Sequence, residues 1–291
     1  MKNRKWLMIL CCVILVAAVV AAVVLLTRPK DTPKETEATA APEATETTEK
    51  TGESRDVLKE IRDRGTVLIA MEGAWQPWTY HDEQGNLTGF DVEIGNLVAE
   101  GLGVKAEFKE TAWDGILAGV DSGRFDMACN GVGYTEERAK AYSFSTPYVY
   151  TEMVLVVRED NTEIQTLEDL KGKKTANSPN STYATRAENA GAEVVYVDTL
   201  GETMEMLLQG RVDATLNAKE SVDSYLAEHP EAKIKVVGSM AGEPVAIPMQ
   251  KGENTKALVE EVNRILEAAR EDGRLAALSE KYFGRDLTKE E

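Results

Sequence analysis

Short apolar runs alternate with helical patterns from residue 55 onward, and this order constrains the fold more than any other feature of the sequence. Residues 67–71 form an apolar run after Gly65 and predict a buried strand, and residues 104–108 predict the next strand. Between them, apolar residues recur at helical spacing as far as Leu102, after a capping residue at Asp91. This repeated β-α-β order predicts an α/β fold with a mainly parallel sheet and helices on its faces.

A second series of the same kind begins near Met153. Thr199 and Glu202 form a capping box that predicts a helix, and a long helix with an apolar face follows Pro248. The strands expected in this series cover residues 154–157, 174–177, 193–197, 214–216 and 234–237. Two α/β units with a closing helix predict two lobes, and the cleft between two lobes is a natural place for a ligand.

An uncharged apolar run of 21 residues, from Trp6 to Leu26, follows a basic N-terminus. A helix of that length spans about 30 Å, the thickness of the hydrocarbon core of a bilayer. Residues 1–27 are therefore predicted to be a signal anchor or a signal peptide. The length favours the uncleaved anchor, because a cleaved peptide has an apolar region of about 7–15 residues. The rest of the chain is expected outside the cytoplasm, tethered to the outer face of the cell membrane, or secreted if the segment is cleaved.

Residues 28–54 are dominated by Thr, Glu, Ala and Pro, and from residue 31 on they contain no aromatic or large aliphatic side chain. Such a stretch cannot offset its ordering entropy by burial. It is predicted to be a disordered linker.

Charge and cysteine content exclude several classes of function. The formal net charge is −17, so the chain lacks the basic surface that nucleic-acid binding requires, and no nucleic-acid partner is expected. Beyond the apolar run there is one cysteine, Cys129, in an apolar strand-like context that predicts a core position. His81 and His229 are far apart, so neither a metal site nor a cofactor is expected.

Eight short motifs occur in order between residues 55 and 287. They are Gly89-Phe90-Asp91-Val92-Glu93, Trp113-Asp114-Gly115, Gly123-Arg124-Phe125-Asp126, Thr135-Glu136-Glu137-Arg138, Phe144-Ser145-Thr146-Pro147-Tyr148, Leu167-Glu168-Asp169-Leu170-Lys171-Gly172-Lys173, Gly210-Arg211-Val212-Asp213-Ala214 and Lys281-Tyr282-Phe283-Gly284. On these motifs the chain resembles the polar-amino-acid family of ABC-importer solute-binding proteins, extracellular solute-binding protein family 3. Residues 130–133 and 178–183 are most similar to its cystine-binding subgroup.

The resemblance implies a two-lobed, periplasmic-binding-protein-like fold of type II, with a hinge and a central cleft. The first lobe would comprise residues 55–150 and 246–291, and the second lobe residues 151–245. The protein would be a monomer that captures a small polar solute, such as an amino acid or cystine, by lobe closure. It would deliver this solute to an ABC permease with its ATPase, without catalysis and without a cofactor.

The resemblance also implies a set of ligand-binding residues. Arg138 would hold the ligand's carboxylate, which a planar guanidinium matches with two hydrogen bonds. Trp75 and Trp113 would enclose the ligand's side chain, whereas Trp78 stands at a structural position. Glu72 would contact the distal end of the ligand. The remaining candidates are polar or backbone groups of the two lobes, namely Asn130, Gly131, Gly133, Ser178, Ser181, Thr182 and Asn217.

One position departs from the family pattern. Where the family places an aspartate that binds the ligand's α-ammonium, this chain has Ala218. Three alternatives stay open: Glu220 replaces the aspartate, Glu243 replaces it, or the ligand has no free α-ammonium.

Two rival functions also stay open. Cyclohexadienyl dehydratases share the expected fold, and a carboxylate such as Glu72 could serve as a general acid or base. The chain could instead be a sensor ectodomain whose signal is carried by a separate protein.

Overall fold

A computed structural model of the protein describes residues 55–290. The predicted anchor or signal segment (1–27) and the predicted linker (28–54) lie outside the described residues. Within residues 55–290, no helix combines the length and the apolarity needed to cross a membrane.

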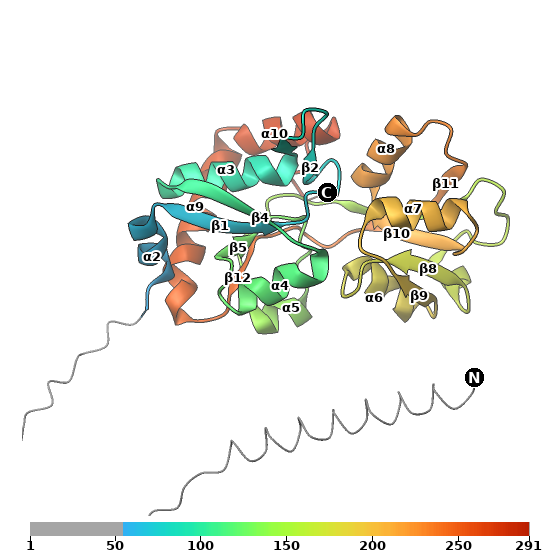
Figure 1. The fold of residues 1–291 in the computed structure, drawn as a ribbon, viewed down its shortest axis with the longest axis horizontal. Helices are drawn as coiled ribbons and strands as arrows, with labels where there is room; N and C mark the ends of the chain where they lie inside the picture. Colours follow the sequence, from blue (N-terminus) through green and yellow to red (C-terminus); the bar gives the residue numbers. More distant parts are fainter. Residues whose placement is uncertain (1–54, 291) are drawn as a thin grey trace, which may run out of the picture. The chain divides into compact units, whose positions relative to one another are not determined.

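Two five-stranded sheets form the centre of two separate lobes (Figure 1). The first sheet has the order β4-β1-β5-β12-β6. Its strands are β1 (Thr66–Met71), β4 (Lys105–Glu110), β5 (Met127–Ala128), β6 (Tyr142–Phe144) and β12 (Pro248–Gln250). The second sheet has the order β11-β7-β10-β8-β9. Its strands are β7 (Glu152–Arg158), β8 (Lys174–Asn177), β9 (Glu193–Tyr196), β10 (Ala214–Ala218) and β11 (Ile234–Ala241). A short hairpin of β2 (Tyr80–His81) and β3 (Leu87–Thr88) extends from the first lobe.

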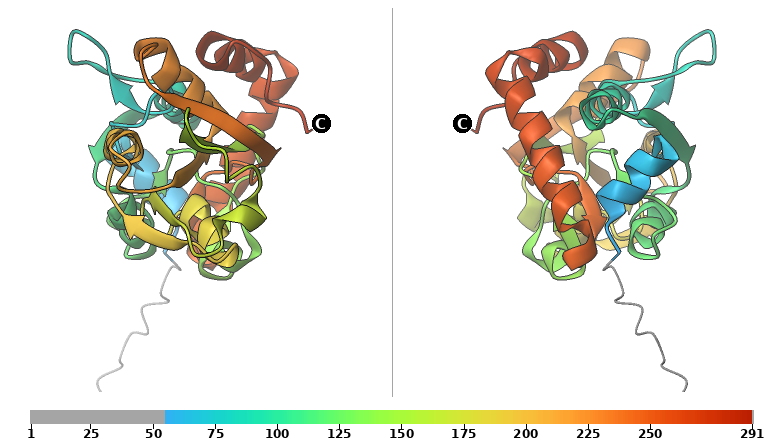
Figure 2. Two further views of the ribbon diagram at one scale, coloured as in Figure 1. Left: turned by 90° about the vertical axis from the view of Figure 1, so that its right-hand side faces the viewer. Right: turned by 90° about the vertical axis from the view of Figure 1, so that its left-hand side faces the viewer.

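Helices cover both faces of each sheet. Those beside the first sheet are α2 (Val57–Arg64), α3 (Phe90–Leu102), α4 (Trp113–Asp121), α5 (Glu136–Ala141), α9 (Lys256–Glu271) and α10 (Arg274–Phe283), with the 3₁₀ turn η2 (Glu253–Thr255) before α9. Those beside the second sheet are α6 (Thr182–Asn189), α7 (Leu200–Leu208) and α8 (Lys219–Glu228), with the 3₁₀ turn η1 (Leu167–Leu170). Figure 2 shows the long helix α9 lying next to α2 and below α10.

The apolar periodicity read from the sequence produces the core of the first lobe. The inward face of α9 carries Leu258, Val262 and Leu266, which are fully buried in one cluster with Ile69 of β1 and Val98 of α3. Burying a side chain of this size contributes about 1.5–3 kcal/mol, so this face stabilises the helix against the sheet. Cys129 is buried in the same cluster, which confirms the predicted core position.

The expectation of mainly parallel sheets is wrong in part, because both sheets are mixed. β1 pairs in parallel with β4 and β5, but β12 runs antiparallel to β5 and β6. β7 likewise runs antiparallel to β10 and β11. The reason is topological: β7 and β12 each enter their sheet directly from the other lobe. No crossover helix within one sheet precedes them, so the β-α-β rule for parallel neighbours does not apply.

Two connecting segments join the lobes, residues 145–151 and 242–247. They pair with each other at the crossing point, where the Tyr148 N–H donates to the Val245 carbonyl (2.9 Å) and the Val245 N–H donates to the Val149 carbonyl (2.9 Å). The two connecting segments are therefore hydrogen-bonded to each other where they cross.

The sequence predicts that Asp91 caps α3, and this prediction is wrong. The helix begins at Phe90 after Gly89, and the Asp91 carboxylate is buried. One of its oxygens accepts a hydrogen bond from the Tyr148 hydroxyl (2.7 Å), and the other accepts one from the Gly131 N–H. Burial raises the pKa of Asp91 to about 7, against the opposing effect of these two hydrogen bonds. Asp91 therefore ties the loop after β5 to the first connecting segment.

Candidate functional site

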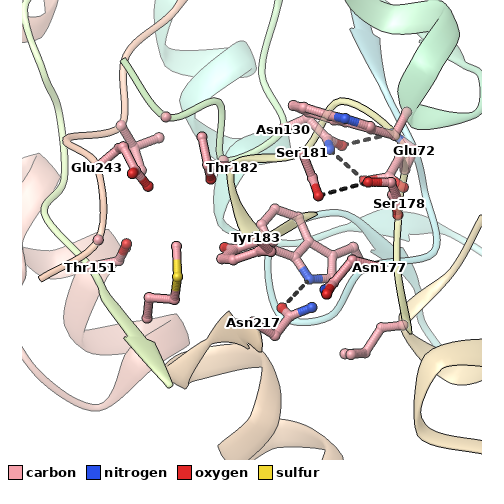
Figure 3. A pocket seen from close by; sticks show the side chains of 18 of the residues that line it. Glu72, Asn130, Thr151, Asn177, Ser178, Ser181, Thr182, Tyr183, Asn217 and Glu243 are labelled. Carbon is pink, nitrogen blue, oxygen red and sulfur yellow. Dashed lines mark hydrogen bonds between the residues drawn. The ribbon is translucent and has the colours of Figure 1, made fainter. Parts of the chain in front are cut away.

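A cavity, partly open to solvent, lies where the two lobes face each other. All eleven residues selected from the sequence line it: Glu72, Trp75, Trp113, Asn130, Gly131, Gly133, Arg138, Ser178, Ser181, Thr182 and Asn217. Nine further residues complete the lining, namely Thr151, Met153, Asn177, Tyr183, Leu200, Thr203, Gly242, Glu243 and Val245. Figure 3 shows most of these side chains around the central space.

Several of the additional lining residues belong to the chain crossings. Thr151, Gly242 and Val245 lie in the connecting segments, and Met153 is the second residue of β7, the first strand after a crossing. The only sequence signal for them was the predicted change of lobe near residues 150 and 245. A hinge residue contributes to the cleft by its place in the chain, not by its side-chain chemistry, so residue type alone does not reveal it.

Glu72 and Asn130 follow the ends of the neighbouring parallel strands β1 and β5, where polar side chains converge at the edge of a sheet. The Asn130 amide donates to a Glu72 carboxylate oxygen (2.6 Å), and its own oxygen accepts hydrogen bonds from the Glu72 backbone N–H (2.8 Å) and the Thr79 hydroxyl (3.2 Å). Asn130 is thus committed to holding Glu72 in place. Burial raises the pKa of Glu72 to about 7, although the Asn130 hydrogen bond acts in the opposite direction.

Two indole rings stand on the first-lobe side of the cavity. Trp75 stacks on Trp78 with ring centroids 5.2 Å apart, and its own N–H donates to the Asn217 oxygen of the second lobe (3.3 Å). Trp78 is 1% exposed and does not line the cavity, in agreement with the structural role expected for it. Trp113 starts α4 and lies under the guanidinium of Arg138, 5.3 Å from its ring centre.

Arg138 projects from α5, a short helix whose N-terminus is capped by the Thr135 hydroxyl. One terminal nitrogen donates to the Gly133 carbonyl (2.8 Å), and the other donates to the Asn180 carbonyl of the second lobe (3.0 Å). Within the part of the chain that the structure describes, no carboxylate forms an ion pair with it. Burial lowers the pKa of Arg138, and the nearby Glu243 is the largest opposing influence. The guanidinium is a half-buried cation whose hydrogen-bond partners among the described residues are neutral carbonyls, so an incoming carboxylate would supply the opposite charge that it lacks.

The second lobe presents the N-terminus of α6. Ser181 caps this helix by accepting from the Ala184 N–H (3.1 Å), and its hydroxyl donates to the Ser178 carbonyl (2.7 Å). The Ser181 hydroxyl is therefore already used within its own lobe. Asn177 donates to the Leu216 carbonyl (2.7 Å), while its side-chain oxygen is buried and accepts no hydrogen bond from the described residues. A ligand that donates a hydrogen bond would satisfy this oxygen.

The surroundings of Ala218 separate the two candidate carboxylates. Glu220 does not line the cavity, and one of its oxygens accepts a hydrogen bond from Arg285 (2.9 Å). Glu243 does line the cavity, and one of its oxygens accepts from Arg186 of α6 (2.7 Å). The Ala218 backbone N–H faces the hydroxyl of Tyr183. The hydroxyl of Tyr183 thus reaches the space next to the short alanine side chain.

Comparison with known proteins places these observations in a family. The sequence model of bacterial extracellular solute-binding proteins, family 3, matches residues 67–285. A probable amino-acid ABC transporter-binding protein of Haemophilus influenzae is 41% identical, over 80% of this chain and 90% of its own. The L-cystine-binding protein TcyA of Bacillus subtilis is 39% identical, over 80% of this chain and 87% of its own.

Two solved structures illustrate the structural similarity. An ancestral arginine-binding protein bound to arginine matches with a TM-score of 0.72 and 37% identity, covering 76% of this chain and 99% of that protein. The L-cystine solute receptor of Neisseria gonorrhoeae, in its unliganded open conformation, matches with a TM-score of 0.55 and 39% identity, covering 81% of this chain and 100% of the receptor.

Proposed function

The chain belongs to family 3 of the bacterial extracellular solute-binding proteins, and from this membership we propose that its cleft captures a polar amino acid, with L-cystine as the first candidate. The two-lobed fold and the relatives make it a solute-binding receptor of amino-acid ABC importers. The observation that carries the proposed ligand class is the cavity between the lobes, where the unpaired cation Arg138 and the carboxyl group of Glu72 line one space.

The carboxylate of the ligand binds Arg138. Two neutral carbonyls hold the guanidinium in the unliganded structure, and a carboxylate would add two parallel charge-assisted hydrogen bonds. The backbone of Gly133 and the N-terminal end of α6 at Thr182 face the same cavity and suit an anion. Gly131 also lines the cavity, but its N–H already donates to Asp91.

The distal end of the ligand lies between Trp75 and Trp113 and reaches Glu72. The carboxyl group of Glu72 and the unpartnered oxygen of Asn177 are both hydrogen-bond acceptors. A ligand with donors at its far end, as in the second ammonium group of L-cystine, would satisfy both. An aliphatic amino acid would leave both desolvated without a partner.

Contacts between the lobes support capture by closure. Besides the Arg138 and Trp75 contacts described above, the Gln76 amide donates to the Glu228 carboxylate at the rim of the cleft (2.6 Å). The structure also matches the arginine-bound relative better than the open receptor, although the open receptor has the higher sequence identity. Both observations favour a closed arrangement, in which the described contacts are those that closure makes.

The finer assignments are part of the same proposal. The first lobe comprises residues 55–150 and 246–291 and the second lobe residues 151–245, with the two connecting segments as the hinge. The protein acts as a monomer outside the cytoplasm, held at the membrane by its N-terminal segment, and passes its ligand to the permease of an ABC importer. It has no enzymatic activity.

The test is calorimetric titration of the full-length chain, in a mild non-ionic detergent, with L-cystine, the standard amino acids and prephenate. Arg138→Ala should weaken binding of the best amino acid by at least about 30-fold, because removing one partner of a desolvated charge pair costs about 2–5 kcal/mol. Arg138→Lys keeps the charge but loses the planar fork, so it should recover only part of the affinity. Arg264→Ala, at an exposed arginine of α9, is the matched control and should change nothing.

Unchanged affinity in Arg138→Ala would refute the proposed site. Conversion of prephenate to an aromatic product would refute the absence of enzymatic activity. This control is included because one structural neighbour is an ancestral amino-acid-binding protein that is a precursor of cyclohexadienyl dehydratase, 32% identical to this chain. Glu72, with its raised pKa, is the residue through which such a proton transfer would pass.

A further inference from the structure

The cavity has a second polar region, separate from the one formed by Glu72 and Asn130. Figure 3 shows the Glu243 carboxylate and the hydroxyls of Thr151, Thr182 and Tyr183 turned toward the same space. These groups come from both connecting segments and from the first turn of α6, so they meet only in the folded chain. The region therefore combines one carboxylate with three hydroxyl groups, all of which can accept hydrogen bonds.

Glu243 is held in place but keeps an unused oxygen. Its side chain is 18% exposed, and Arg186 binds one oxygen at 2.7 Å. Within residues 55–290, the other oxygen accepts no hydrogen bond. The backbone also fixes this position, because a Cβ added to Gly133 would lie 2.9 Å from the Glu243 Cβ. The carboxylate is thus oriented by Arg186 and by close packing against Gly133, and its second oxygen is available to a ligand.

The Tyr183 hydroxyl indicates which charges surround this space. Burial raises the pKa of Tyr183, Glu220 and Glu243 raise it further, and Arg138 lowers it. The hydroxyl is therefore neutral and within electrostatic reach of both Arg138 and Glu243. These two opposite charges line one cavity, yet they do not pair with each other.

We propose that Glu243 binds the α-ammonium group of the ligand while Arg138 binds its α-carboxylate, so that the protein selects free α-amino acids over carboxylic acids of the same shape. An α-amino acid carries both charges on one carbon, which matches a guanidinium without a carboxylate partner and a carboxylate with one unused oxygen that face one space. An ammonium group donates three hydrogen bonds and accepts none. The free oxygen of Glu243 and the hydroxyls of Tyr183 and Thr151 supply three acceptors. This inference rests on the proposed function, because it takes Arg138 as the carboxylate site.

Glu220, the other acidic residue near Ala218, is not the ammonium site. It lies in the first turn of α8, with its side chain 3% exposed, and it bonds Arg285, which also binds Glu152. Its carboxylate does not reach the cavity. A ligand without an ammonium group would leave Glu243 desolvated on closure with only Arg186 to compensate, and this penalty is the source of the selectivity.

The experiment compares amino acids with their deamino analogues by calorimetric titration of the full-length chain. The probe pairs are L-arginine with 5-guanidinopentanoate and L-glutamine with glutaramate, because each of these analogues lacks only the α-ammonium group. L-cystine is titrated beside them without its deamino analogue, which would also lose the ammonium group at the far end. In the unmodified protein the bound amino acid should be at least about 30-fold tighter than its analogue, the ratio expected from one desolvated charge pair. In Glu243→Gln this ratio should fall to near one, because affinity for the amino acid drops while affinity for the analogue is kept.

Retained binding of the analogue also shows that Glu243→Gln has folded. Glu243→Asp, which keeps the charge on a shorter side chain, should keep part of the ratio. Glu220→Gln is the matched control and should keep all of it. A full ratio in Glu243→Gln, or a lost ratio in Glu220→Gln, would overturn the assignment.

The two levels of inference fail in different ways. If the unmodified protein binds both members of a pair equally, the ammonium site is wrong and the carboxylate-binding function stands. If it binds neither L-cystine nor any standard amino acid nor any analogue, the proposed function fails and the ammonium site fails with it.

Discussion

Replacing Glu72 by glutamine should stabilise the unliganded protein at pH 8 and have little effect at pH 4. Burial raises the pKa of Glu72 from its usual 4.5 to about 7. At pH values between 4.5 and about 7, the unfolded chain has released the proton of Glu72 while the folded chain still holds it. The folded state therefore binds more protons, and the free energy of unfolding falls as the pH rises through this window. Glutamine carries no ionisable proton, so the variant lacks this loss.

The expected size follows from the two pKa values. At about 1.36 kcal/mol per pKa unit, a rise from 4.5 to about 7 corresponds to about 3 kcal/mol. The variant should therefore gain about 3 kcal/mol relative to the unmodified protein between pH 4 and pH 8. Asp91, whose pKa is also raised to about 7, contributes a slope of the same sign in both proteins and cancels in the comparison.

The assay is urea unfolding of both proteins at several values between pH 4 and pH 8, followed by tryptophan fluorescence without ligand. Each free energy comes from linear extrapolation to zero urea. Glu280→Gln, at an exposed position of α10, is the matched control and should show no comparable pH-dependent gain. A difference between Glu72→Gln and the unmodified protein that stays constant from pH 4 to pH 8 would refute the reasoning, because it would mean that the pKa of Glu72 is the same in the folded and the unfolded chain.

Three further changes have defined outcomes. Asp91→Asn removes one of the two acceptors used by Tyr148 and the loop after β5, and should lower the free energy of unfolding by about 1–3 kcal/mol in urea at neutral pH; an unchanged midpoint would contradict the buried contact. Gly133→Ala places a methyl group against Glu243, so closure should be hindered and ligand affinity should fall by about tenfold or more in calorimetry; full affinity would mean that the lobes approach less closely. Deleting residues 1–27 should leave a soluble, folded protein with an unchanged ligand affinity, and an insoluble or unfolded product would count against the tether model.

Local patterns were sufficient for most of the secondary structure. Apolar side chains at helical spacing placed the buried face of α9 correctly, since this periodicity depends only on neighbours within a few turns. Cys129 was assigned to the interior from its apolar, strand-like context and Trp78 was given a structural position by the family resemblance, and both are buried. The eleven residues that the family resemblance selected line one cavity, and their role in binding remains a proposal.

Predictions that needed long-range information were less successful. Asp91 has the residue type and the position of a helix cap, but its carboxylate instead binds Gly131 and Tyr148, which follow it by 40 and 57 residues. The strand directions of β7 and β12 were likewise missed, because they depend on the two crossings between the lobes.

The sequence by itself determined the α/β fold, the two series of elements and the absence of an acidic residue at position 218. It left open which carboxylate could compensate for Ala218, because Glu220 and Glu243 are equally plausible along the chain. Only the tertiary structure separated them. Glu220 binds Arg285 and does not line the cavity, whereas Glu243, in the second connecting segment, does line it. The physical reason is that the electrostatics of a cleft depend on distances across the fold, and these distances are set by how the lobes meet.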